Sequence, residues 1–185
     1  MYTVEAHCHF ELLLWNALHW SCAEVMSLSR EFSVTDGGLA MDTRIAGWGY
    51  EGHTVAELVE FTRAIGAEWV VDVRLTPLSR KPGFSKRALA SALAEQGLRY
   101  VHLPELGNPK DNRAGFADVE GTYGDTVRER YRTEVLASEA AVAALSWLAE
   151  TGARDGAVLL CFEAEATQCH RAEIQNALLR AQMAV

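Results

Sequence analysis

Hydrophobic and polar residues follow two different periods along residues 44–183, one typical of strands and one typical of helices. Short, largely apolar runs bounded by Gly, Pro or polar residues predict four strands, at 45–48, 69–73, 99–103 and 157–162. Between and after them, apolar residues recur at helical spacing, and Thr54-Val55-Ala56-Glu57 forms a capping box at the start of the first helix. The predicted helices cover about 54–65, 85–96, 123–136, 139–150 and 169–183.

This alternation of strands and helices predicts a single α/β domain of Rossmann-like or flavodoxin-like architecture. We expect a mainly parallel sheet of about four to five strands, with helices on both faces in three layers. Ligands of such sheets bind beyond the carboxyl ends of the strands. Functional side chains are therefore expected in the loops that follow the predicted strands, at 49–54, 74–85, 104–122 and 162–169.

The first forty residues do not share this pattern and end in the loop-like segment Thr35-Asp36-Gly37-Gly38. We predict that the domain covers residues 41–185, beginning near Met41, and that residues 1–40 are an N-terminal extension outside it. The alternative is an N-terminal helix packed on the domain.

Composition narrows the class of protein. Hydrophobic residues make up 49% and charged residues 23%, as in ordinary globular domains, and the net charge of −8 argues against a general DNA-coating role. The four cysteines, at 8, 22, 161 and 169, are too few and too scattered for a disulfide framework, which favours a reducing compartment. No apolar run reaches the roughly 18 residues that cross a bilayer, and no signal peptide is evident. We expect a cytoplasmic protein without membrane contact.

The most informative loop follows the last predicted strand. Cys161 and Glu163 leave that strand, and Cys169-His170-Arg171 opens the last predicted helix. Unpaired N–H groups at a helix start and neighbouring positive charge favour a thiolate. We therefore predict that Cys169 is a nucleophile or redox-active thiol, with Glu163 or His170 handling protons. The alternative is that both cysteines are small buried residues and Arg171 is a structural ion-pair partner.

Two more specific hypotheses for this loop, a phosphatase loop and a zinc site, are tested by residue spacing. A cysteine-dependent phosphatase loop needs an arginine six positions after the strand-end cysteine, where this chain has Thr167. Zinc sites usually contain paired ligands at short spacing. Cys161, Cys169 and His170 offer three soft ligands without a Cys-x-x-Cys pair, so no metal site is predicted, and a metal-binding protein remains an alternative.

The second predicted strand also ends in charged residues. Alternation along it points Asp72 and Arg74 to one side, at an edge suited to a ligand; a mutual salt bridge is the alternative. Residues 73–94 contain no acidic residue, and this local positive patch suits a phosphate or carboxylate. Its basic residues are Arg74, Arg80, Lys81, Lys86 and Arg87.

Five segments carry a family resemblance: Gly49-Tyr50-Glu51-Gly52, Val71-Asp72-Val73-Arg74, Pro77 with Ser79-Arg80 and Phe84, Tyr100-Val101-His102-Leu103-Pro104-Glu105-Leu106-Gly107, and Cys161-x-Glu163 followed by Cys169-His170-Arg171. In this order they resemble the bacterial and archaeal domain of unknown function 488 family, from about Arg44 to Gln182. The resemblance implies a small α/β domain and adds Ser79 and Glu105 as site candidates without assigning a reaction. The chain departs from the family pattern in its first forty residues, and it stops at Val185, where relatives usually continue into another strand.

The favoured hypothesis is an enzyme acting on an anionic, phosphate- or nucleotide-like small molecule. Its catalytic candidates are Cys169, His170, Glu163 and Asp72, and its ligand-binding candidates are Arg74, Ser79, Arg80, Glu105, Arg171 and Tyr50. The alternatives are a non-catalytic module that binds anions or nucleic acid, and a Cys/His metal-binding protein. Nucleic acid is the less favoured partner, because only Phe84 places an aromatic ring within the basic patch. The motifs name no cofactor.

Overall fold

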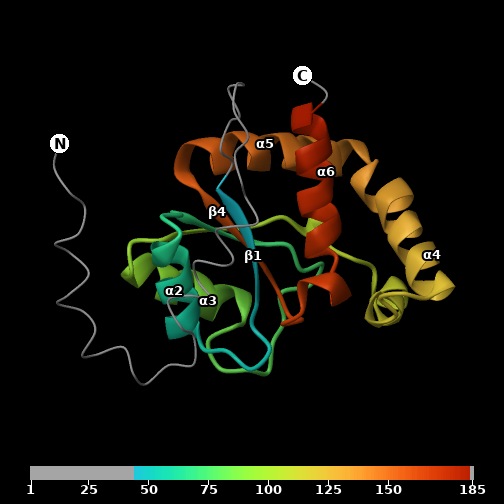
Figure 1. Ribbon diagram of the computed structural model, residues 1–185. Coiled ribbons are helices and arrows are strands. Elements are labelled where there is room, and N and C mark those ends of the chain that lie inside the picture. Colours follow the sequence, from blue (N-terminus) through green and yellow to red (C-terminus); the bar gives the residue numbers. More distant parts are fainter. Residues whose placement is uncertain (1–43, 184–185) are drawn as a thin grey trace, which may run out of the picture. The chain divides into compact units, whose positions relative to one another are not determined.

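The computed structural model of the protein describes residues 44–183 (Figure 1). The predicted N-terminal extension and the domain start near Met41 lie outside the described residues, so that boundary stays a prediction. Within the described range, no helix is both long enough and apolar enough to cross a membrane.

Four parallel strands form one sheet, which confirms the predicted α/β fold. The strands are β1 (Ile45–Gly49), β2 (Trp69–Asp72), β3 (Arg99–His102) and β4 (Ala157–Cys161), and their order across the sheet is β1-β4-β2-β3. The last of these four strands in sequence is thus a central strand of the described sheet. It pairs in parallel with β1 on one side and with β2 on the other.

Helices connect and cover the strands: α2 (Val55–Ala64), α3 (Lys86–Glu95), α4 (Thr122–Arg130), α5 (Glu139–Asp155) and α6 (Arg171–Met183). The predicted capping box is present, because the Thr54 side chain accepts from the Glu57 N–H and the Glu57 side chain accepts from the Thr54 N–H. The helix predicted at 123–136 is α4 followed by a π-helical segment, Tyr131–Leu136. Short 3₁₀ turns occupy much of the predicted long loop, at Pro104–Leu106, Lys110–Asn112 and Ala114–Ala117.

The sheet has an apolar core on each face, which confirms the three-layer arrangement. On one face, Val70 and Leu160 pack with residues of α2 and α3. On the other face, Val71 and Val73 pack with residues of α5 and α6. Figure 1 shows α2 and α3 together and α5 and α6 together, with the strands between the two groups. Period-two alternation along buried strands accounts for both cores.

The neighbouring strands β2 and β4 send the chain to opposite faces of the sheet. After β2 the chain continues into α3, and after β4 it continues into α6, which packs on the other core. In parallel α/β sheets, ligands usually bind at the carboxyl ends of two strands whose connections diverge in this way. The Val73 N–H donates to the Leu160 carbonyl oxygen at 3.1 Å, so the segment after β2 stays beside the end of β4. The candidate site lies at this junction.

Candidate functional site

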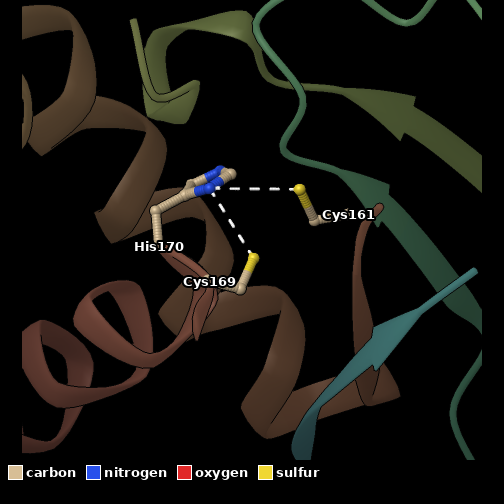
Figure 2. A group of neighbouring side chains, drawn as sticks. All are labelled: Cys161, Cys169 and His170. Atoms are coloured by element: carbon tan, nitrogen blue, oxygen red, sulfur yellow. Dashed lines mark hydrogen bonds between the residues drawn. The ribbon is translucent and has the colours of Figure 1, made fainter. Parts of the chain in front are cut away.

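Two cysteines and a histidine converge at the end of β4 (Figure 2). Cys161 is the last residue of β4, and Cys169 and His170 directly precede α6; all three are buried. His170 Nδ1 lies 3.9 Å from Cys161 Sγ and 3.7 Å from Cys169 Sγ. The two sulfurs and one nitrogen all lie within 4.8 Å of one another. The fold therefore brings together the side chains of two free cysteines that are eight positions apart in the sequence.

The orientation of His170 is fixed by its other nitrogen. His170 Nε2 lies 3.0 Å from the carbonyl oxygen of Val73, which can only accept. In the neutral imidazole Nε2 therefore carries the hydrogen, and the Nδ1 lone pair faces the two sulfurs. Tyr131 packs edge-on against the His170 ring at 5.5 Å, and its hydroxyl donates to the Leu106 carbonyl at 2.6 Å. These contacts hold the imidazole from both sides.

The two sulfurs have opposite surroundings. Cys169 Sγ accepts from Arg171 Nε at 3.3 Å. Although burial opposes ionisation, the neighbouring Cys161 thiol and the Arg171 charge hold the Cys169 pKa well below its usual range. The neighbouring Cys169 and burial both raise the pKa of Cys161. The Arg171 contact and these opposite shifts favour a thiolate at Cys169 and a thiol at Cys161.

Glu163 borders this pair. Its Oε2 accepts from Cys161 Sγ at 3.1 Å, and its side chain is half-buried. Burial, followed by the negative charge of Cys169, raises the pKa of Glu163. Arg171 also donates to the Glu163 backbone carbonyl, so one guanidinium contacts both Cys169 and the backbone of this loop. A carboxyl group with a raised pKa can exchange a proton with a neighbouring thiol, here Glu163 with Cys161.

Gly49 allows the loop after β4 to approach β1 closely. A Cβ at Gly49 would lie 1.8 Å from the Glu163 carbonyl oxygen and 2.8 Å from the Ala164 Cα. Only a residue without a side chain fits, because both neighbouring atoms belong to the backbone. The Glu51 N–H donates to the Phe162 carbonyl at 2.9 Å and extends this contact beyond the strand. Gly49 therefore sets the path of the segment that carries Glu163.

We predict that Gly49→Ala destabilises the protein by roughly 1–3 kcal/mol, because the added methyl group overpacks a backbone contact. Gly47→Ala is the matched control, since the nearest atom to its added Cβ is the Gln175 side-chain oxygen at an ordinary 3.5 Å. Urea denaturation of both variants measures the difference in the free energy of unfolding. Equal stabilities of the two variants would contradict the role assigned to Gly49.

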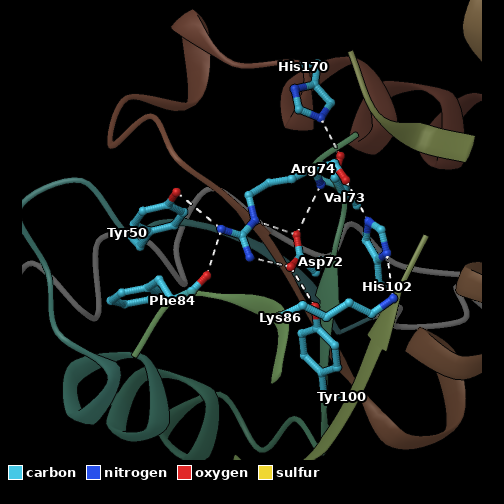
Figure 3. Close-up of polar contacts among 9 residues, drawn as sticks. All are labelled: Tyr50, Asp72, Val73, Arg74, Phe84, Lys86, Tyr100, His102 and His170. Atoms are coloured by element: carbon cyan, nitrogen blue, oxygen red, sulfur yellow. Dashed lines mark hydrogen bonds and ion pairs between the residues drawn. The ribbon is translucent and has the colours of Figure 1, made fainter. Parts of the chain in front are cut away.

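A second polar cluster lies at the end of β2 (Figure 3). Arg74 and Asp72 form a buried, two-point ion pair, with Nε to Oδ1 at 2.8 Å and Nη2 to Oδ2 at 2.6 Å. Arg74 Nη1 donates to the Tyr50 hydroxyl at 3.2 Å and to the Phe84 carbonyl at 3.0 Å, and Tyr100 donates its hydroxyl hydrogen to Asp72 at 2.7 Å. The mutual salt bridge, left open by the sequence, is the arrangement that the structure has.

This ion pair changes what the predicted anion-binding residues can do. Arg74 and Arg171 already donate to groups within the protein. Arg80, by contrast, is exposed and has no hydrogen bond or ion pair within residues 44–183. Ser79 accepts from the Lys81 N–H at 3.1 Å within its own loop, and Glu105 is exposed in the Pro104–Leu106 turn. Arg171 contacts Cys169, whereas Ser79, Arg80 and Glu105 make no hydrogen bond with the cysteines within the described residues.

The structure corrects one detail of the sequence interpretation. Cys169 does not lie in the first turn of a helix, because α6 begins at Arg171 and Cys169 has an extended backbone with φ −130° and ψ 145°. The direct contact from the Arg171 guanidinium therefore replaces the helix start as the source of positive potential. Sequence reasoning missed Tyr131, which no nearby motif marks, and Tyr100, whose hydroxyl position depends on the pairing of β2 with β3.

The fold and the site define a three-layer α/β protein with a buried cysteine–histidine cluster at the carboxyl edge of its sheet. The family model described as domain of unknown function DUF488 matches residues 54–178, and the chain belongs to this family. No curated protein and no solved structure matches the chain. The matched region includes all three residues of the cluster.

Proposed function

We propose that the protein binds a divalent, thiophilic metal ion, most suitably zinc, through Cys161, Cys169 and His170. The observation that carries this proposal is the convergence of two sulfurs and the His170 Nδ1 lone pair within 4.8 Å. Thiolate and imidazole are the ligands that zinc prefers. The hydrogen bond from His170 Nε2 to a backbone carbonyl is the outer contact that typically orients a metal-binding histidine.

The distances support tetrahedral coordination. With zinc bonds of about 2.3 Å to sulfur and about 2.0 Å to nitrogen, a tetrahedral site separates sulfur from nitrogen by about 3.5 Å. The two sulfur–nitrogen distances here are 3.7 and 3.9 Å, so these two pairs need shifts of only a few tenths of an ångström. The two sulfurs lie within 4.8 Å and must approach by up to about 1 Å to reach the ~3.8 Å of such a site. Glu163, whose Oε2 lies 3.1 Å from Cys161 Sγ, borders the group and would have to move to take the fourth position. A metal ion there would replace the proton between Cys161 and Glu163.

Charge balance supports a divalent ion. Two thiolates and the Glu163 carboxylate carry three negative charges, and Arg171, which is 1% exposed, carries one positive charge. A divalent ion makes this group neutral. Uncompensated charge is costly to bury, so the metal-free protein must hold protons at Cys161 or Glu163 instead.

The proposal is tested by adding zinc to metal-stripped, full-length protein. We expect one zinc ion to bind per chain, and cobalt in its place should give the near-ultraviolet absorption of thiolate-to-cobalt charge transfer. The double variant Cys161→Ser/Cys169→Ser is the control, because it removes both sulfurs and leaves Cys8 and Cys22 unchanged. Zinc binding that is equally tight in this variant, or absent from the unaltered protein, would refute the proposal.

Arg171 supports a second candidate function, an enzyme that acts on an anionic small molecule with Cys169 as a reactive thiol. The Nε–H of Arg171 donates to Cys169 Sγ, while Cys161 is itself a donor to Glu163. In metal-free protein we therefore expect iodoacetamide to alkylate Cys169 before Cys161, because thiolates react and thiols do not. Peptide mass spectrometry at increasing labelling times gives the order. Reaction of Cys169 only after unfolding would remove the nucleophile from this candidate function.

A further inference from the structure

We infer that Cys161 and Cys169 also form a peroxide-reactive thiol pair, whose oxidation to a disulfide expels the bound metal. The release of metal rests on the proposed function, whereas the pairing of the two thiols does not. The inference concerns a second activity of the same sulfurs, the reduction of a peroxide.

The hydrogen bonds give the two cysteines different roles. Cys169 accepts from Arg171 at 3.3 Å, which favours the anion that attacks a peroxide oxygen. Cys161 donates to Glu163 at 3.1 Å, so the carboxylate is in place to take its proton when Cys161 attacks in turn. Reactive thiols of this kind often have a second, resolving cysteine beside them. Here the second sulfur lies within 4.8 Å.

The chemistry is balanced with hydrogen peroxide as the oxidant. The Cys169 thiolate attacks one peroxide oxygen, the O–O bond breaks, and the leaving hydroxide takes a proton to become water, which leaves Cys169 as a sulfenic acid. Cys161, giving its proton to Glu163, attacks the Cys169 sulfur, and the sulfenic oxygen leaves as a second water. Overall, the Cys169 thiolate, the Cys161 thiol, one peroxide and one proton give one disulfide and two waters; in the zinc-loaded protein both sulfurs start as thiolates, and two protons are taken up. A disulfide sulfur is a poor metal ligand, so the ion is released.

The surroundings favour a small oxidant and allow the bond to form. Cys169 is only 2% exposed, which restricts bulky reagents more than a molecule close to water in size. Forming the bond requires the sulfurs to approach to about 2.05 Å. Residues 162–164 are held by contacts to β1, the loop after it and Arg171, whereas residues 165–168 are exposed, so the part next to Cys169 can adjust with little loss of buried apolar surface.

The test uses full-length protein in which Cys8→Ser and Cys22→Ser leave the pair as the only cysteines. Zinc-loaded and metal-free samples are treated with hydrogen peroxide, and a chromophoric chelator follows zinc release. Cys161 and Cys169 fall in one tryptic peptide, Asp155–Arg171, so the disulfide appears as the loss of two hydrogen masses from that peptide. We expect this loss to develop together with zinc release, and both to be reversed by a thiol reductant.

Two single variants in the same background test the assigned roles. With Cys161→Ser, oxidation should stop at the Cys169 sulfenic acid, which appears as the gain of one oxygen mass by the Asp155–Arg171 peptide. With Cys169→Ser, peroxide oxidation of Cys161 should be at least about tenfold slower, because its sulfur lacks the guanidinium contact. Equal oxidation rates in the two variants, or faster oxidation of Cys161, would overturn the assignment. Circular dichroism shows whether each variant is folded.

The outcomes separate the two proposals. Zinc binding without any peroxide-induced disulfide overturns the inference and leaves the metal site intact. Disulfide formation in a protein that never binds zinc supports the thiol pair and refutes the metal site, together with metal release. Disulfide formation that leaves zinc bound refutes the coupling between oxidation and release.

Discussion

Replacing Asp72 with alanine is expected to lower the free energy of unfolding by roughly 3–5 kcal/mol, the usual result of removing one partner from a buried ion pair. In the unaltered protein burial opposes the Arg74 charge, but the hydrogen bonds and charge of Asp72 outweigh burial and raise the Arg74 pKa. Arg74 would keep its charge without Asp72, because a guanidinium stays protonated in proteins. Asp72 is fully buried and also accepts from Tyr100. The substitution therefore leaves the Arg74 guanidinium and the Tyr100 hydroxyl without their shared hydrogen-bond partner.

Asp111→Ala is the matched control, since Asp111 also pairs with an arginine, Arg130, but at the surface. It should change stability little, because water replaces the lost partner. The double variant Asp72→Ala/Arg74→Met should recover part of the loss, because it removes the stranded charge. Chemical denaturation measures all three variants. If Asp72→Ala and Asp111→Ala proved equally stable, the buried pair would not hold the end of β2 as argued.

Replacing His170 with alanine is expected to weaken zinc binding at least about 100-fold, because losing a ligand costs no less than losing one of its outer contacts. The substitution removes Nδ1 from the cluster and also the Nε2 contact to Val73. Competition with a chromophoric chelator, on metal-stripped protein, measures the affinity.

His102→Ala provides a control of the same type. His102, the last residue of β3, also contacts a backbone carbonyl through Nε2, that of Arg74, at 2.8 Å. Its Nδ1 faces Lys86 at 3.1 Å instead of a sulfur. The zinc affinity of His102→Ala should therefore stay within about twofold of that of the unaltered protein, because His102 lies outside the proposed coordination shell. Similar losses in both variants would mean that His170 acts only through the fold.

Local sequence signals predicted most of the architecture. The capping box at Thr54 fixed the start of α2, and strong apolar runs identified all four strands. The insertion of β4 between β1 and β2 was beyond such signals, because strand order depends on long-range pairing. The π-helical segment that begins at Tyr131 was also beyond them, since its residues follow the same apolar spacing as an ordinary helix.

The candidate site was predictable in part. Cys161, Glu163, Cys169, His170 and Arg171 were all marked, because strand ends and helix starts in α/β folds carry functional side chains. Spacing alone argued against a metal ligand set, since Cys161 and Cys169 are separated by seven residues. The fold removes that separation by returning the chain from the end of β4 to the start of α6 beside it. Three-dimensional proximity, and not sequence spacing, determines whether donors share an ion.

The position of β4 in the sheet also governs the order in which the protein can be assembled during synthesis. Within the described sheet, β1 pairs only with β4, and β4 is the last of the four strands to leave the ribosome. Until then a nascent chain can pair β2 with β3, while β1 has no neighbour and one edge of β2 stays open. Open edges are where chains associate wrongly. Ribosome-bound chains that end before Ala157 should consequently depend on chaperones, and the cysteine–histidine cluster is completed in the same late step that closes the sheet.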